Sequence, residues 1–143
     1  MTRTEHCPQC GGFIGDAGCN SPRHKYSEFL TGLLKSKPRK TTVAEFDKAL
    51  AEKFYVNTAK AGVRVGFGKR LLIHMAHHTA ADQKRRKEML LFAVKTVKSG
   101  RRGRNPKGGP NSWGYAKRFD GFKMLVLTDA KGNVEDCFNF FND

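Results

Sequence analysis

Three cysteines and a histidine near the start of the chain have the spacing of a metal site. Cys7, Cys10, Cys19 and His24 form the pattern Cys-x2-Cys-x8-Cys-x4-His in a glycine-rich segment. Three thiolates and an imidazole suit tetrahedral Zn²⁺, and the glycines let the chain curl around one centre. His6 is an alternative fourth ligand, although it would be cramped beside Cys7. Because four protein ligands leave no open position, we expect one structural Zn²⁺ per chain.

Three histidines in the middle of the chain are the candidates for catalysis. A helix that begins near Lys69 would place His74 and His78 one turn apart, with His77 beside them. Imidazole can take and give a proton near neutral pH, so this cluster suits acid/base catalysis. Two other interpretations stay open. The histidines can form a second metal site, for which no third ligand is evident, or a basic face that only helps to bind phosphate.

The chain is strongly basic, and the charge is concentrated in its middle. Twenty-seven Lys and Arg against 13 Asp and Glu give a formal net charge of +14. Residues 84–107 hold ten of these cations and one acidic residue, Glu88. Because phosphate contacts release counterions, nucleic acid is the expected partner. The expected contact residues are Arg85, Arg86, Arg101, Arg102, Arg104, Lys107 and Trp113, whose indole can stack on a base.

Length and composition exclude several classes of protein. A chain of 143 residues fits one ordinary domain with a small appendage, which excludes a large multidomain enzyme. Eleven Phe and a hydrophobic content of 38% are enough for a core. No apolar run approaches the roughly 18 residues of a membrane span, and the N-terminal sequence MTRTEHCPQC lacks the apolar segment of a signal peptide. We therefore expect a cytoplasmic protein without a membrane partner.

Hydrophobic spacing predicts two helices, followed by an extended segment. Residues 27–37 form a short amphipathic helix that Pro38 ends, and residues 43–54 form a second helix capped by Thr41 or Thr42. Residues 55–67 are rich in β-branched and aromatic types, which predicts an extended segment or a short hairpin.

Capping, glycine and proline residues in the second half of the chain predict a basic helix, a loop and three strands. Thr79, with Asp82 three residues later, resembles a capping box that starts a bend or a new helix, and Gly100 would end it. Residues 99–114 hold five Gly and two Pro, which predicts a loop. Strands are expected over 113–119, 122–128 and 133–141, with Cys137 as a small core residue. The predicted fold class is α+β, with helices packed on a small antiparallel sheet and preceded by a zinc knuckle.

The chain resembles a known superfamily in the order of its elements and in two segments, GVRVGFGKRLLIHMAHH and YAKRFDGFKMLVLTDAKGNVEDCFNFF. Over about residues 54–143 the chain resembles the barnase/EndoU/colicin/RelE-like (BECR) nucleases, especially the phage-associated type. The resemblance implies metal-independent RNA cleavage in which the 2′-hydroxyl attacks the adjacent phosphate. Where such proteins often carry Thr or Ser on the last strand, this chain has Asp136 and Cys137. The catalytic residues that it implies are the helical His74 or His78 and, from the sheet, Tyr115, Lys117, Arg118 and Thr128.

We therefore predict a zinc knuckle over residues 1–26, a helical linker region over 27–53 and a BECR-like nuclease domain over 54–143. The expected function is that of a phage- or toxin-type ribonuclease in the cytoplasm, of a host cell if phage-encoded, with His74, His77 and His78 as the acid/base candidates. One alternative is a non-enzymatic, zinc-containing regulator that binds nucleic acid or inhibits host machinery. Another is a virion component that packs duplex DNA. A host or immunity protein is a further expected partner.

Overall fold

The computed structural model describes residues 38–105 and 108–141. The expected zinc ligands Cys7, Cys10, Cys19 and His24, the expected helix over 27–37 and Lys107 lie outside the described residues.

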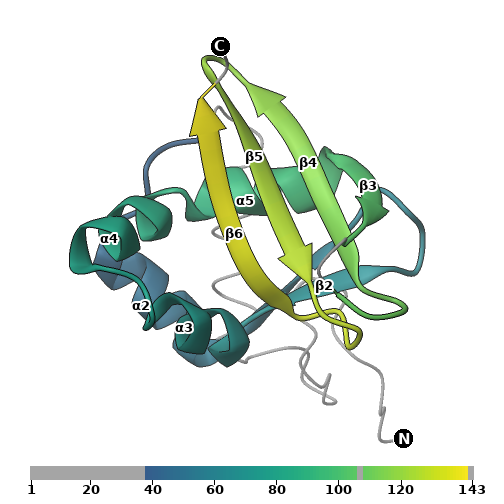
Figure 1. Cartoon of the computed structure of the whole chain (residues 1–143), viewed down its shortest axis with the longest axis horizontal. Coiled ribbons are helices and arrows are strands. Elements are labelled where there is room, and N and C mark those ends of the chain that lie inside the picture. Colours follow the sequence, from purple (N-terminus) through teal and green to yellow (C-terminus); the bar gives the residue numbers. More distant parts are fainter. Residues whose placement is uncertain (1–37, 106–107, 142–143) are drawn as a thin grey trace, which may run out of the picture.

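Helices and strands follow one another as in an α+β protein, which confirms the expected class (Figure 1). The helices are α2 (Val43–Glu52), α3 (Lys69–Met75), α4 (Ala80–Glu88) and α5 (Leu90–Ser99). The strands are β1 (Phe54–Asn57), β2 (Arg64–Phe67), β3 (Arg101–Arg104), β4 (Trp113–Phe119), β5 (Phe122–Thr128) and β6 (Val134–Phe141). None of the described helices combines the length and the apolar character needed to cross a bilayer.

The larger sheet is antiparallel in the order β3-β4-β5-β6, and α5 packs across one of its faces (Figure 1). Helices α2, α3 and α4 gather beside its β6 edge. Strands β1 and β2 form a separate hairpin, which is joined to the β5–β6 turn by a hydrogen bond from the Gly66 amide to the Gly132 carbonyl at 2.8 Å. This arrangement leaves the outer face of the larger sheet, opposite α5, uncovered by that helix.

One apolar cluster of described residues holds these layers together. Phe46 of α2, Leu71 of α3 and Leu90 of α5 are buried in the same cluster as Met124 and Cys137 of the sheet. Helix α2 lies in the range expected to form a linker, yet its buried side chains belong to the core of the domain. Burying an apolar side chain of this size contributes roughly 1.5–3 kcal/mol, so α2 is part of the folding unit.

The predicted starts of α2 and α4 are confirmed, whereas α2 ends at Glu52 and not at residue 54, because Phe54 begins β1. Thr42 accepts a hydrogen bond from the Glu45 amide at 3.1 Å, and Thr79 accepts one from the Asp82 amide at 3.2 Å. These hydroxyls satisfy amides that the first turn of a helix leaves unpaired. Gly100 follows the last residue of α5, as expected.

The prediction of a loop over residues 99–114 is wrong at its start, because residues 101–104 form β3. This strand pairs with β4 through the partners Arg101 with Ala116, Arg102 with Tyr115, Gly103 with Gly114 and Arg104 with Trp113. An edge strand is stabilised by backbone hydrogen bonds on one side, so it needs no apolar alternation. The predicted strands over 113–119 and 122–128 are confirmed, and the last strand begins at Val134.

Gly100 connects α5 to β3 where two carbonyls approach closely. A Cβ added to Gly100 would clash with the Thr96 carbonyl oxygen and lie 2.7 Å from that of Ala116, whereas one added to Gly103 would meet nothing within 4 Å. We expect Gly100→Ala to lower the free energy of unfolding by about 1–3 kcal/mol, as overpacking does. The matched variant Gly103→Ala should stay within about 0.5 kcal/mol of wild type in urea unfolding. Equal losses in the two variants would contradict this account of the connection.

Candidate active site

His74 and His78 lie together at the end of α3. His74 is in the last turn of the helix and His78 follows three residues after its end, and their ring centroids are 5.2 Å apart. The predicted helix from near Lys69 is therefore confirmed, and the two rings meet although the helix stops at Met75. The side chain of His77 is exposed and, within the described part of the chain, has no hydrogen bond or ion pair to either ring.

Each ring of the pair is held by a carboxylate. Nε2 of His74 lies 3.3 Å from Oδ2 of Asp136, and Nδ1 of His78 lies 3.0 Å from Oδ2 of Asp82. A carboxylate partner fixes the orientation and the tautomer of an imidazole. The sequence indicates Asp82 only as part of a helix cap and Asp136 only as a difference from the superfamily that the chain resembles, so it predicts neither pairing.

Arg86 joins the two carboxylates. Its Nη1 donates to Oδ1 of Asp136 at 2.8 Å, and its Nε donates to Oδ2 of Asp82 at 3.0 Å. Arg85 donates to the other oxygen of Asp82 at 2.6 Å. The Arg85 hydrogen bond lowers the pKa of Asp82, and Arg86 adds to that shift against the opposing effect of burial. Arg86 is therefore committed to holding the site, whereas the half-exposed Arg85 stays reachable from solvent.

A β-bulge directs Asp136 toward the histidines. Leu127 pairs with Asp136 while Thr128 pairs with Val134, so Glu135 is the extra residue on β6. Bulges change which way the neighbouring side chains point. Glu135 lies 3.6 Å from Arg70, whose guanidinium is half-exposed. Arg70 precedes His74 by one helical turn, so the spacing Arg70, His74, His78 is the sequence signal that places this side chain beside the histidines.

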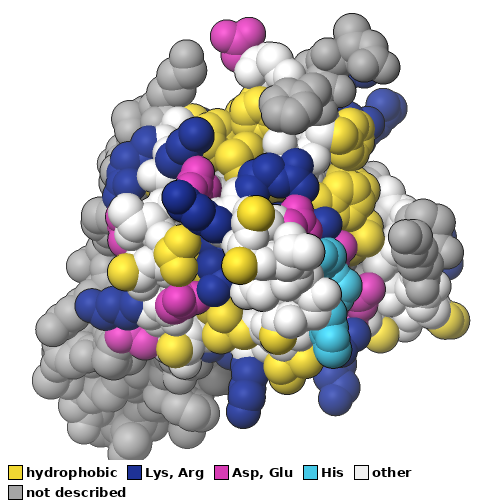
Figure 2. All heavy atoms as spheres, turned by 60° about the vertical axis from the view of Figure 1, so that its left-hand side comes forward, with side chains coloured by type: hydrophobic (Ala, Val, Ile, Leu, Met, Phe, Trp, Pro, Cys, Tyr) yellow, Lys and Arg dark blue, Asp and Glu magenta, His cyan; other side chains and the backbone are white. Residues whose placement is uncertain are grey.

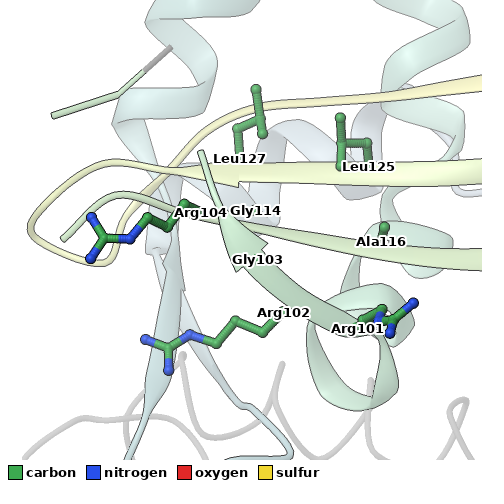
Figure 3. A pocket seen from close by; sticks show the side chains of 8 residues that line it. All are labelled: Arg101, Arg102, Gly103, Arg104, Gly114, Ala116, Leu125 and Leu127. Atoms are coloured by element: carbon green, nitrogen blue, oxygen red, sulfur yellow. The ribbon is translucent and has the colours of Figure 1, made fainter. Parts of the chain in front are cut away.

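The outer sheet face connects this cluster to the basic strand β3. Cross-strand partners lie on one face, and one row runs through Gly103, Gly114, Leu127 and Asp136 across all four strands. The β3 end of the row opens into a shallow pocket of ≈ 300 Å³, and Figure 3 shows arginine side chains of β3 extending from its rim. The pocket is lined by Arg101, Arg102, Gly103, Arg104, Gly114, Ala116, Leu125 and Leu127.

Of the four sheet residues that the resemblance implies, only Arg118 lies on this outer face, paired with Lys123. Tyr115 is 2% exposed on the α5 side, where burial raises the pKa of its hydroxyl. The Thr128 hydroxyl is buried, accepts a hydrogen bond from the Trp113 amide and donates one to the Trp113 carbonyl. Lys117 shares the α5 side with its partner Met124. The structure therefore does not bring Tyr115, Thr128 or Lys117 to the histidines.

Trp113 and Cys137 both make contacts within the protein that limit their availability to a ligand. The Arg102 guanidinium lies 3.7 Å from the centroid of the Trp113 ring, so an arginine already stacks on the indole expected to meet a base. Cys137 is fully buried, as predicted for a core residue, and burial raises the pKa of its thiol to about 12. At neutral pH this thiol is protonated, which suits a packing role rather than a nucleophile.

Histidine side chains form one continuous strip on the surface, with acidic and basic side chains along its border (Figure 2). The cluster is therefore within reach of a ligand from solvent. Searches for similar proteins found no matching family model, curated protein or solved structure. The geometry and charge of the site are therefore the guide to its chemistry.

Asp82 gives the site a pH dependence with a defined sign. Its pKa is lower in the folded chain, so its ionised form stabilises the fold above the unfolded value of about 3.9, and this stabilisation is lost as the pH falls through the folded value. We expect Asp82→Asn to lower the free energy of unfolding by about 1 kcal/mol at pH 7, with the difference from wild type shrinking toward pH 3. Urea unfolding at several pH values measures this, and Asp120→Asn, in an exposed turn, is the control. A difference that grows with acid would contradict the assignment.

Proposed function

We propose that this protein is an endoribonuclease of the BECR type that binds RNA across the outer sheet face and cleaves it beside His74 without a metal ion. The observation that carries the proposal is the pairing of His74 with Asp136. His74 is the more accessible member of the pair, with 41% of its side chain exposed, and its carboxylate partner stands at the end of the row that begins in the basic pocket.

The chemistry needs a base, a stabiliser of charge and a proton for the leaving group. Asp136 holds Nε2 of His74, which leaves Nδ1 to take the proton of a 2′-hydroxyl. The 2′-oxygen then attacks the adjacent phosphorus, the bond to the 5′-oxygen breaks, and a 2′,3′-cyclic phosphate forms. Arg70, one turn away and half-exposed, is the cation we assign to the charge on the phosphate. Solvent supplies the proton to the leaving oxygen, because Nε2 of His78 is buried.

The basic side chains account for binding. Arg101 and Arg118 come from different strands of the outer face, and Arg85 extends from α4 beside the histidines. Electrostatic contacts of this kind bind phosphate without regard to sequence. The same proposal includes the structural Zn²⁺ at Cys7, Cys10, Cys19 and His24, a cytoplasmic location, and a role for the N-terminal segment in docking RNA or a protein partner.

A second candidate function follows from the burial of Tyr115 and Thr128. If catalysis in this superfamily needs those hydroxyls, the chain retains the RNA-binding face without the cleavage step. It is then a non-enzymatic nucleic-acid-binding regulator. The two functions differ in one observable, the presence of cyclic-phosphate ends.

Cleavage is tested with tRNA and a mixed single-stranded RNA in EDTA, with analysis of the 3′ ends. We expect wild type to leave 2′,3′-cyclic phosphates and His74→Ala to lose about 10²–10⁴-fold in rate, the range for a general base. His77→Ala is the matched control, because His77 is a neighbouring exposed histidine that makes no ion pair with the cluster in the described structure. An uncut substrate favours the regulator, and equal rates for His74→Ala and wild type remove His74 from the mechanism.

Binding is tested by the salt dependence of RNA affinity. Arg101→Ala combined with Arg118→Ala removes two cations of the outer face, so the slope of log affinity against log salt should fall by about 1 to 2. Lys98→Ala is the control, because it removes a cation from α5, on the other side of the sheet. Fluorescence anisotropy at four salt concentrations gives the slopes. If Lys98→Ala changes the slope as much per charge as the arginine variant, RNA does not prefer the outer face.

A further inference from the structure

The geometry points to a divalent metal site formed by His74, His78 and Asp136, which binds Zn²⁺ reversibly and competes with proton transfer by His74. Each residue offers one ligand atom, and the three atoms lie within 4.8 Å of one another. Two imidazoles and a carboxylate are a common ligand set for Zn²⁺. The inference rests on the same side chains as the proposed function, but it does not require the protein to cut RNA.

The spacing of the first two ligands matches a bound ion. Two atoms on one tetrahedral Zn²⁺ lie about 3.4 Å apart, given bonds of about 2.0–2.2 Å to nitrogen and oxygen. Nε2 of His74 and Oδ2 of Asp136 are 3.3 Å apart. The pair therefore needs little rearrangement to bind one ion between them.

We assign Nε2 of His78 as the third ligand atom. Nδ1 of this ring lies 3.0 Å from Oδ2 of Asp82, so the carboxylate favours the tautomer with its proton on Nδ1 and the lone pair on Nε2. That nitrogen is buried and has no hydrogen-bond partner among the described residues. Buried polar atoms are rarely left unpaired, and a carboxylate behind the opposite nitrogen is the usual support of a metal-binding histidine. A bound ion would satisfy this nitrogen.

Arg86 limits how Asp136 can bind the ion. Its guanidinium occupies Oδ1 at 2.8 Å, so Asp136 can offer only Oδ2 to a metal. The positive charge of Arg86 beside the site also opposes a second cation, which weakens binding and makes it reversible. With Zn²⁺ on Nε2 of His74, the one proton of the neutral ring lies on Nδ1, the nitrogen assigned as the base, so Zn²⁺ binding and proton transfer by His74 exclude each other.

The test follows the ring nitrogens of histidine in the ¹⁵N NMR spectrum of the full chain as Zn²⁺ is added. We expect the signals of His74 and His78 to shift together and that of His77 to stay in place. Asp136→Asn should weaken this response at least about tenfold, whereas His77→Ala should leave it unchanged. If the circular dichroism spectrum shows that Asp136→Asn does not fold, His74→Gln replaces it, because the His74 side chain is half-exposed. This variant should abolish the response of His78.

Rings that do not respond to a tenfold excess of Zn²⁺ would overturn the inference, as would an undiminished response of His78 in His74→Gln. Because the signals belong to individual histidines, Zn²⁺ at the expected cysteine site does not confuse the result. An RNA cleavage assay with and without Zn²⁺ separates the two proposals. If the His74 and His78 signals shift with Zn²⁺ but the protein never cuts RNA, only the ribonuclease proposal is refuted. If the protein cuts RNA and these signals do not shift, only the metal site is refuted.

Discussion

The Arg86 guanidinium is the interaction on which the site depends. It connects α4 to β6 by binding Asp82 and Asp136, which are far apart in the sequence, and only a small part of its side chain is exposed. Each of those carboxylates in turn holds one histidine. A largely buried charge network is stable only when all its members are paired, because removing one leaves the others without compensation. The positions of both imidazoles therefore follow from one arginine.

The outer sheet face is shaped by where the fold places small residues. Helix α5 covers the other face, where Tyr115, Met124 and Cys137 are buried in the core. On the outer face, Gly103 pairs with Gly114, so this row carries no side chain on β3 or β4. The result is a shallow surface with cations at its β3 edge and the histidines at its β6 edge. A chain of phosphates crossing the sheet would meet the cations and then the imidazoles.

Local signals predicted most of the elements, whereas the site depends on contacts that are distant in sequence. Thr42, Thr79 and Gly100 mark helix ends by local chemistry, and these boundaries are confirmed. β3 was missed because its pairing with β4 uses backbone groups and leaves no pattern in the side chains. The partnership of Asp136 with His74 requires both the strand register and the bulge at Glu135, and a slip of one residue would turn Asp136 to the other face. Tyr115 and Thr128 have suitable chemistry, but the sequence does not say which face of the sheet α5 covers.

An imidazole nitrogen can use its lone pair for a proton or for a metal ion, but not for both at once. In this cluster the choice is set by the cations around it, because Arg85 and Arg86 balance the charge of Asp82 and Asp136. Additional negative charge at the site would favour a permanently bound ion, and fewer carboxylates would leave the rings unsupported. The observed balance keeps the histidines oriented while opposing a second cation. Arg86, which holds both carboxylates, is thus also the cation that opposes a bound metal ion, and under the proposed mechanism it keeps His74 available for proton transfer.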